Sequence, residues 1–280
     1  MKIIIFGAKG MLGQELGRAF QIGNLLYLLD RADLDILDLP KLTDYILDKK
    51  PDLIINAAAY NDVDKAESEF ELAQKINGEA AVAMAKAAAK INSILIHYST
   101  YYVFDGVKKE GYKEDDLPAP LSKYGQSKLS GEQARNYCTK CYLIRTSRLF
   151  GKTGTGDGAK SSFVDKILKV VETQNIVDIV NEEASNPTYA NDLAYYTRYL
   201  LNKNLPFGIY HITNGGACTW YEFAKEIFRL SRKNVTINPV SGSQFNRPAP
   251  RPMYSSLLNT KLPKIRNWKE ALAEYLKENK

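Results

Sequence analysis

Two side chains one helical turn apart are the first candidates for chemistry in this sequence. Tyr124 and Lys128 are four residues apart, so on a helix they lie on the same face. The reference pKa of a phenol is about 10, and a nearby ammonium favours the phenolate and lowers that pKa. The pair therefore suits general acid–base catalysis near neutral pH. The alternative is a surface helix on which the spacing is accidental.

Two hydroxyl side chains end the apolar run that precedes this helix. Ser99 and Thr100 follow residues 93–98, which we expect to form a buried strand. At the carboxyl end of that strand, their hydroxyls could hydrogen-bond a carbonyl oxygen beside the phenol. We therefore group Ser99 and Thr100 with Tyr124 and Lys128.

A glycine-rich turn follows the first apolar run of the chain, residues 2–6, and an amphipathic stretch continues to about residue 22. Strand, glycine-rich turn and helix N-terminus form the usual cradle of a dinucleotide, because the turn lets the pyrophosphate approach and the helix amides point at it. The alternative is a turn that is merely tight. The residues predicted to bind the cofactor here are Gly7, Gly10, Met11, Leu12 and Gly13.

The end of the next expected strand, residues 25–29, carries conflicting signals about the coenzyme. Asp30 would bind the ribose hydroxyls of NADH, whereas Arg31 would hold the 2′-phosphate of NADPH. Asp35 and Ile36 are expected to flank the adenine, although a solvated loop would explain these acids equally well. The cofactor prediction is therefore NADPH or NADH.

Small residues follow the third expected strand, residues 52–56, and would let a ligand lie against the backbone. These predicted floor residues are Ala57, Ala58, Ala59 and Tyr60. Asn77 falls inside an alanine-rich helix expected from about residue 71 to 90, where a buried amide needs partners. We assign Asn77 to the cofactor site, where it could brace the strand or a water chain.

Two arginines lie in a proline-rich segment near the end of the chain. Arg247 and Arg251 fall within residues 246–252, and guanidinium forks match the oxygens of a diphosphate. A stiff surface loop is the alternative. Both arginines are candidates for binding an anionic substrate.

The elements that position these residues alternate regularly. Apolar runs that read as buried strands are separated by helical stretches, at residues 2–6, 25–29, 52–56, 93–98 and 142–146. Such alternation predicts right-handed βαβ units in an α/β, Rossmann-type, doubly wound parallel sheet. We expect a dinucleotide-binding domain over residues 1–150, with returning segments from about 176–212, and a smaller lobe over residues 151–280. The glycine-rich residues 151–158 are expected to form a mobile loop over the site.

The composition places the chain among globular proteins, with 280 residues of which 45% are apolar and 25% charged. The net charge of +6 is mild and dispersed, which suits anionic small molecules and not nucleic acid. Three cysteines and two histidines form neither an even disulfide framework nor a metal-binding cluster, so we expect no metal. With no apolar run of membrane-spanning length and no signal peptide, we expect a cytoplasmic protein without membrane contact.

Short blocks with a recognisable order run along most of the chain. They lie at residues 56–60 (Asn-Ala-Ala-Ala-Tyr), 63–67 (Val-Asp-Lys-Ala-Glu), 103–106, 124–132, 145–147, 187–188 and 251–255. Together they closely resemble the extended short-chain dehydrogenase/reductases, and within these the dTDP-4-dehydrorhamnose reductase family. The combination is far more specific than any single motif.

The resemblance implies a Rossmann-type cofactor domain and a carboxyl-terminal lobe that binds a nucleotide-diphosphate sugar. It implies NAD(P)H-dependent reduction of a nucleotide-linked 4-keto-6-deoxy sugar, forming dTDP-L-rhamnose or a related sugar for polysaccharide synthesis. Tyr124 would then donate the proton, Lys128 would bind the nicotinamide ribose, and Thr100 would orient the carbonyl. Arg251, with Arg247, would bind the substrate diphosphate.

Three departures from the family's pattern concern the substrate and the metal. Tyr101 stands where the family usually has Asp, and Arg148 where it usually has Trp, so the identity of the sugar stays open. We place Tyr101, Phe104 and Arg148 in the substrate site. Some members form a magnesium-linked dimer, and Glu15 matches one of its acids, but Asn191 replaces another. A homodimer is therefore compatible with the resemblance, without a predicted metal.

Two other functions remain on the same scaffold. The β-subunit of methionine adenosyltransferase resembles the same reductases, so a non-catalytic, cofactor-binding regulatory subunit is the main alternative. Epimerisation or dehydration of a nucleotide sugar ranks last, because Tyr101 and Tyr102 supply no acid after Thr100.

Overall fold

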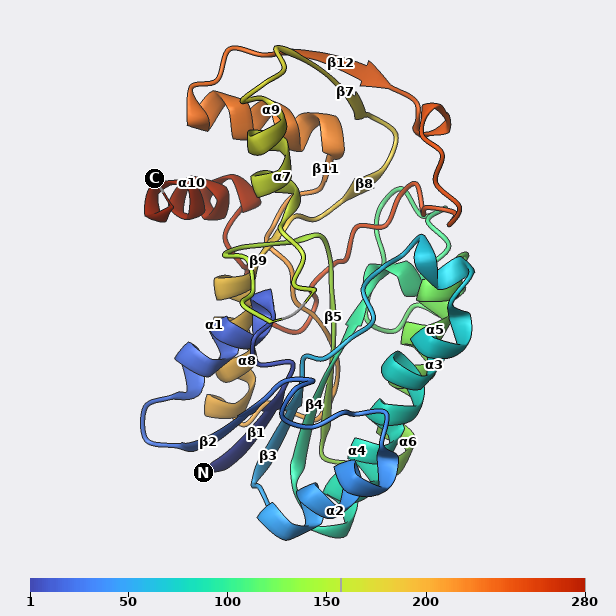
Figure 1. Ribbon diagram of the computed structural model, residues 1–280, viewed down its shortest axis with the longest axis vertical. Coiled ribbons are helices and arrows are strands. Elements are labelled where there is room, and N and C mark those ends of the chain that lie inside the picture. The colour runs from blue at the N-terminus through green and yellow to red at the C-terminus, as the bar shows by residue number, and fades with distance from the viewer. Residues whose placement is uncertain (157, 280) are drawn as a thin grey trace.

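The computed structural model describes residues 1–156 and 158–279, and a parallel sheet of six strands is its framework (Figure 1). The strands are ordered β10-β5-β4-β3-β1-β2. Their bounds are β1 Lys2–Phe6, β2 Leu25–Leu29, β3 Leu53–Asn56, β4 Ile94–Thr100, β5 Cys141–Thr146 and β10 Gly208–His211. The order reverses between β1 and β3, and a crevice at such a point, beyond the carboxyl ends of the strands, is where α/β sheets bind ligands.

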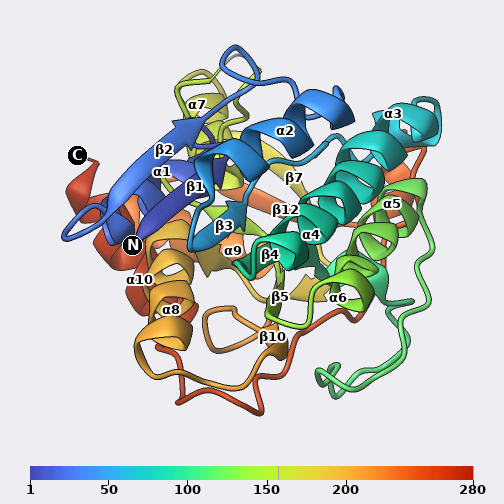
Figure 2. The same cartoon turned by 90° about the horizontal axis from the view of Figure 1, so that it is seen from below.

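Helices cover both faces of the sheet (Figure 2). One face carries α1 (Met11–Phe20) and α8 (Ala190–Asn202). The other carries α2 (Leu39–Lys49), α4 (Ala80–Lys90), α5 (Lys123–Glu132) and α6 (Ala134–Tyr137), with α3 (Phe70–Gln74) and the π-helical η2 (Lys75–Glu79) leading into α4. Strand β1 shows why both faces must be covered, because Ile3 and Ile5 pack in the core under α1 and α8 while Ile4 and Phe6 pack in the core under α2 and α4.

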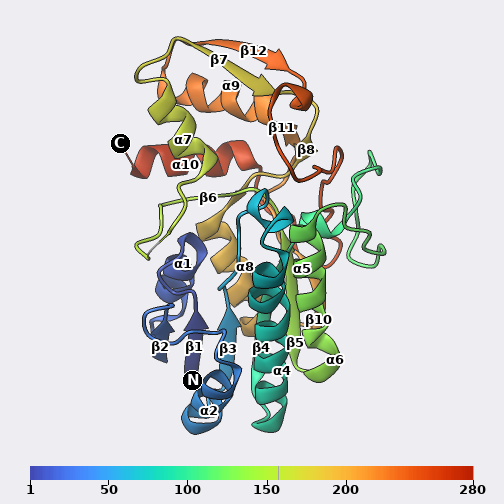
Figure 3. The same cartoon turned by 45° about the vertical axis from the view of Figure 1, so that its right-hand side comes forward.

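A smaller lobe lies beyond the carboxyl ends of the sheet strands (Figure 3). Its short strand pairs are β12 with β7, β11 with β8, and β6 with β9. Their bounds are β6 Leu149–Phe150, β7 Ile176–Val180, β8 Ala184–Ser185, β9 Thr188–Tyr189, β11 Cys218–Thr219 and β12 Thr236–Val240. Around them pack α7 (Phe163–Val170), α9 (Trp220–Ser231) and α10 (Trp268–Glu278). Several aromatic side chains pack in this second core, among them Phe150, Tyr189, Phe223, Trp268 and Tyr275.

The Rossmann-type prediction is confirmed, but the chain returns to the sheet later than expected. Strand β7, at the start of the predicted returning segment 176–212, pairs with β12 in the lobe. The return is made by α8 and β10, which pairs with β5. The exposure of β7 gives the reason, since Ile176 and Asp178 are solvent-exposed whereas the inner strands of the sheet are buried on both faces.

Candidate active site

The proposed catalytic helix α5 is fixed at its N-terminus against the end of β4. The Ser122 hydroxyl caps the helix by accepting a hydrogen bond from the Gly125 amide (3.1 Å). A Cβ on Gly125 would lie 2.3 Å from the Tyr102 carbonyl oxygen, so only glycine permits this approach to η3 (Tyr101–Val103). The helix thereby brings Tyr124 and Lys128, both buried, beside Thr100 at the carboxyl end of β4.

Burial raises the pKa of the Tyr124 phenol, and a hydrogen bond with Thr100 opposes this shift. We expected Lys128 to lower this pKa, and the structure differs. The Lys128 ammonium donates to the Tyr98 carbonyl oxygen (2.7 Å), and Thr100 is the group that lowers the pKa of Tyr124. Burial lowers the pKa of Lys128 itself to about 8, although the Glu132 carboxylate opposes the shift. The phenol therefore keeps its proton at neutral pH, which is the form that a proton donor needs.

Ser99 does not accompany Thr100, contrary to our prediction. Successive side chains of a strand point to opposite faces, and the Ser99 hydroxyl donates to Glu132 Oε1 (2.6 Å) inside the protein. Glu132 also accepts two hydrogen bonds from Arg145, at 2.9 Å from Nε and 2.7 Å from Nη2. Ser99 thus helps to hold α5 on the sheet. Sequence reasoning missed Glu132 and Arg145, although Glu132 continues the four-residue spacing of Tyr124 and Lys128.

The glycine-rich turn has the close backbone packing that a dinucleotide cradle requires. Gly7 has φ +71°, and a Cβ there would lie 2.7 Å from the Ala58 amide nitrogen. A Cβ on Gly13 would lie 2.1 Å from the Gly7 carbonyl oxygen. Gly10 precedes α1 without a side-chain cap, so the first amides, including those of Met11 and Leu12, are left for an anionic ligand. The turn therefore fits a pyrophosphate group.

The glycine-rich segment after β6 lies directly over this turn, as the sequence suggested. The Thr155 amide donates to the Lys9 carbonyl oxygen (2.8 Å), and Gln14 Nε2 donates to the Thr155 hydroxyl (3.3 Å). A Cβ on Gly154 would lie 2.4 Å from the Lys9 carbonyl oxygen. Asp157, within the predicted loop, lies outside the described residues.

The acidic residues predicted for the ribose and adenine also shape their own turns. Asp30 Oδ1 accepts from the Arg31 amide (2.7 Å), and Asp35 Oδ1 accepts from the Leu37 amide (3.0 Å). The Arg31 side chain is exposed, while Ile36 is partly buried beside the sheet core. Both Asp30 and Arg31 therefore remain candidates for the coenzyme ribose.

Asn77 braces the end of β3 instead of presenting its amide to a ligand. Its Oδ1 accepts from the Tyr60 amide (2.9 Å), and its Nδ2 donates to the Tyr60 carbonyl oxygen (3.1 Å) and the Ser127 hydroxyl (2.9 Å). This side chain therefore ties the floor that follows β3, which includes Ala57, Ala58 and Ala59, to helix α5. It lies in the π-helical η2, an irregularity often found at functional sites.

Two residues predicted to face the substrate have other roles. Phe104 is fully buried and stacks on Tyr112 with ring centroids 4.2 Å apart, so it belongs to the core under the site. Arg148 donates to the carbonyl oxygens of Cys218 (3.1 Å) and Glu183 (2.8 Å). Its guanidinium also lies 3.9 Å from the centroid of the Trp220 ring. Arg148 therefore connects the end of the sheet to the lobe.

Three predicted substrate residues remain, Tyr101, Arg247 and Arg251, and two of them, Tyr101 and Arg251, lie near Tyr102. The rings of Tyr101 and Tyr102 are 4.6 Å apart, and Tyr102 meets Tyr124 edge to face at 5.4 Å. Arg251 lies near enough to oppose the burial that raises the pKa of Tyr102. Arg251 is thus near the Tyr102 ring that packs against Tyr124.

Each of these arginines is paired with a carboxylate that sequence reasoning missed. Arg247 forms an ion pair with Glu183 (2.6 Å), which also accepts from Trp220 Nε1 (3.1 Å). Arg251 forms a bidentate pair with Asp64, at 2.9 Å and 2.7 Å. Asp64 could have been suspected, because it falls in one of the family blocks.

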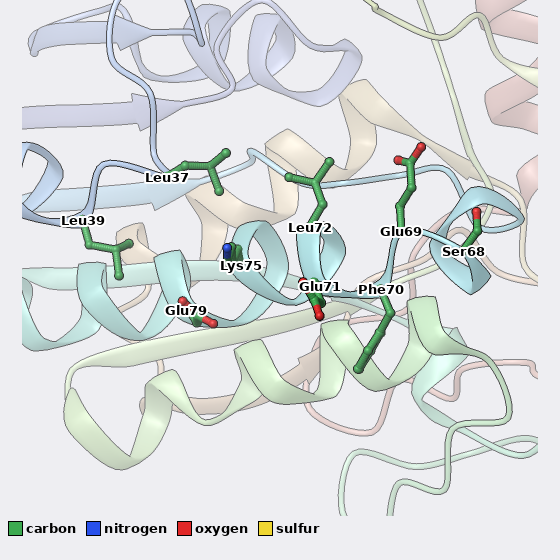
Figure 4. Close-up of a pocket in the computed structure, with 9 residues that line it drawn as sticks. All are labelled: Leu37, Leu39, Ser68, Glu69, Phe70, Glu71, Leu72, Lys75 and Glu79. Carbon is green, nitrogen blue, oxygen red and sulfur yellow. The ribbon is translucent and has the colours of Figure 1, made fainter.

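An open depression of about 780 Å³ lies elsewhere, between the start of α2 and the α3–η2 segment (Figure 4). It is lined by Leu37, Leu39, Ser68, Glu69, Phe70, Glu71, Leu72, Lys75 and Glu79. None of the catalytic candidates lines it. We therefore place the active site from the geometry around Tyr124 and not from this depression.

No group of three or more metal-ligating side chains is assembled within residues 1–156 and 158–279. The two oxygens of Glu15 accept instead from Arg18 (2.6 Å) and Asn191 (3.4 Å). Over the same residues, every helix is too short or too polar to cross a membrane.

The sheet order, the glycine-rich turn and the buried Thr100–Tyr124–Lys128 group define an extended short-chain dehydrogenase/reductase. Comparison with known proteins is more specific. The chain belongs to the family of the RmlD substrate binding domain, whose model matches residues 1–280.

Named relatives and solved structures agree with this assignment. The chain is 36% identical to the spore coat polysaccharide biosynthesis protein SpsK of Bacillus subtilis, over 99% of this chain and 97% of the relative. It is 37% identical to the dTDP-4-dehydrorhamnose reductase of Escherichia coli K12, over 93% and 90%. The structure of a dTDP-4-dehydrorhamnose reductase from Bacillus anthracis in complex with NADP superposes with a TM-score of 0.94, at 34% identity over 99% of both chains. The predicted family resemblance is confirmed.

Proposed function

We propose that the protein reduces the C4 carbonyl of a dTDP-linked 4-keto-6-deoxy sugar at the expense of NADPH or NADH, forming dTDP-L-rhamnose or a closely related sugar. Family membership supports this reaction, as do relatives named dTDP-4-dehydrorhamnose reductase. The observation that carries the proposal is the burial of Thr100, Tyr124 and Lys128 together at the carboxyl end of β4.

In this mechanism the bound coenzyme would supply the hydride for the sugar carbon, and the chain would supply position and a proton. Tyr124 stays protonated because burial raises its pKa, and it gives its proton to the carbonyl oxygen as negative charge develops there. The Thr100 hydroxyl orients that oxygen beside the phenol. The Lys128 ammonium, held at the Tyr98 carbonyl, would bind the nicotinamide ribose. Arg251 and Arg247 would bind the diphosphate of the substrate.

The two parts of the chain would divide the ligands between them. We assign the coenzyme to the domain over residues 1–150 and the sugar nucleotide mainly to the lobe over residues 151–280, with α8 and β10 returning to the first domain. NADP in the Bacillus anthracis relative supports a role for Arg31 with NADPH, whereas Asp30 would favour NADH. A cytoplasmic location and a homodimer stay predictions.

The test is oxidation of NADPH and of NADH in the presence of dTDP- and UDP-linked 4-keto-6-deoxy sugars, with the product identified by mass spectrometry. We expect coenzyme oxidation and a product two hydrogens heavier with at least one dTDP sugar. If the protein binds coenzyme but oxidises it with none of the sugars, the proposal is wrong and the regulatory-subunit alternative takes its place. A product of unchanged mass would indicate epimerisation.

A further inference from the structure

The Arg251 guanidinium is held from one side only. A guanidinium has five N–H donors, two on each terminal nitrogen and one on Nε. Nη1 donates to Asp64 Oδ1 (2.9 Å) and to the Ala249 carbonyl oxygen (2.6 Å), and Nη2 donates to Asp64 Oδ2 (2.7 Å). Within the described part of the chain, Nε–H and the second N–H of Nη2 have no partner. These two donors lie on one edge and point the same way, which is the geometry that grips a phosphate with two hydrogen bonds.

Asp64 and Arg251 come from two segments that are far apart in the sequence. Asp64 lies just before the short helix η1 (Lys65–Glu67), in the loop after β3, while Arg251 lies in the proline-rich segment that follows the lobe strands. Asp64 Oδ1 also accepts from the Ala249 amide (3.2 Å), so this carboxylate fixes both the guanidinium and the backbone two residues before it. The Arg251 side chain is only 13% exposed, which limits its alternative orientations.

We propose that Asp64 is a positioning residue, which fixes the Arg251 guanidinium so that its remaining edge faces the diphosphate of the nucleotide sugar. This inference rests on the proposed function, in which Arg251 binds that diphosphate. In this role Asp64 acts through Arg251 and not by direct contact with the ligand. It acts by removing the rotational freedom of a long side chain before the ligand arrives, which reduces the entropy lost on binding.

Asp64 could also have the opposite effect on diphosphate binding, and the experiment distinguishes the two. A carboxylate beside a guanidinium could instead compete with phosphate, and removing its charge would then tighten binding. The positions of the used donors argue against competition, because Asp64 occupies the end of the fork and leaves the Nε edge free.

The experiment measures the Kd of dTDP by calorimetry for the full-length protein and for Asp64→Asn. Asparagine keeps the size and one acceptor oxygen but loses the charge and the second acceptor. We expect the Kd of dTDP, and the KM of the sugar nucleotide, to rise about tenfold, because Arg251 loses a charge-assisted hydrogen bond to residue 64 and is no longer fixed in its binding orientation. The kcat and the Kd of NADPH should stay within about twofold of the wild-type values, which a general folding defect would not allow.

Asp62→Asn is the matched control. Asp62 lies on the same loop and forms an ion pair with Lys160 (2.7 Å), but it makes no hydrogen bond to Arg251. This variant should bind dTDP as the wild type does. In an Arg251→Ala background, Asp64→Asn should not change the Kd of dTDP further, because Asp64 acts on the ligand only through Arg251.

Wild-type or tighter binding of dTDP by Asp64→Asn would overturn the inference, as would an equal loss of affinity in the Arg251→Ala background. Failure of the proposed function would be seen in a different result. If the wild type binds dTDP but reduces no 4-keto sugar, the reaction is wrong while the role of Asp64 can still be read from dTDP binding. A wild-type protein that binds neither dTDP nor UDP would refute both.

Discussion

Tyr124 is a buried phenol whose proton can leave only to a base that lies close to it. Tyr124→Phe removes that proton but keeps the ring that packs against Tyr102. We expect kcat to fall by roughly a hundredfold or more, the usual contribution of a positioned general acid, with the Kd of NADPH near the wild-type value. Tyr142→Phe is the control, since it removes a different phenol, which donates to the Leu205 carbonyl oxygen (2.6 Å). Undiminished turnover in Tyr124→Phe would refute the proton-donor role.

The lowered pKa of Lys128 leads to a prediction of how activity depends on pH. Its pKa is lowered from 10.5 to about 8 by burial, so the ammonium is present below this pH and is lost as the pH rises through it. The pKa of Tyr124 is raised, so the phenol stays protonated over the same interval. We therefore expect kcat/KM for the coenzyme to decline above about pH 8. A steady-state pH profile measures this, and Lys128→Arg, which stays charged, should abolish the decline. The same decline in Lys128→Arg would assign the ionisation to another group.

At the scale of elements, helix α5 depends on a buried ion pair for its position on β4 and β5. Glu132 joins Arg145, with 7% and 2% of their side chains exposed, and accepts from Ser99 as well. Glu132→Gln leaves a buried guanidinium without its counter-charge, and we expect a loss of about 3 kcal/mol in the free energy of unfolding. Urea denaturation measures it. Glu226→Gln breaks a pair on α9 in which the partner, Arg229, is 67% exposed, and it should cost less than about 1 kcal/mol. Similar losses in both variants would contradict this account.

The same element shows what sequence reasoning could and could not predict. Burial of β4 on both faces, and the joint orientation of Tyr124 and Lys128 on α5, follow from an apolar run and from helical spacing. Ser99 and Thr100 point to opposite faces because side chains alternate along a strand. This difference could have been predicted from the sequence, but we grouped the two residues together. The hydrogen-bond partner of Lys128 is the Tyr98 backbone carbonyl. Every residue has a backbone carbonyl, so the sequence does not show which one Lys128 contacts. Phe104 was predicted to be a site residue, but its ring stacks on Tyr112 and belongs to the core.

At the scale of the whole molecule, the sheet and the lobe must be held in one arrangement if a coenzyme on the first is to meet a sugar on the second. The glycine-rich turn, the βαβ order and the family blocks predict both parts, but not where the chain returns to the sheet. The predicted returning segment began at about residue 176, where β7 begins. Only its one-sided burial reveals that it belongs with β12. Contacts between the parts, such as those of Arg148, involve residues far apart in sequence and could not be predicted.

Arg148 supplies the last prediction, because it bonds the end of the sheet to two carbonyls of the lobe and stacks on Trp220. Arg148→Met keeps an apolar stem but removes both hydrogen bonds. We expect faster amide hydrogen exchange around residues 218–220 and a higher KM for the sugar nucleotide, with the Kd of NADPH unchanged, because the first domain keeps its own core. Arg198→Met is the matched control, since Arg198 donates to the Ala19 carbonyl oxygen (2.9 Å) within the first domain. Exchange that rises equally in both variants, or not at all, would show that Arg148 does not hold the lobe in place.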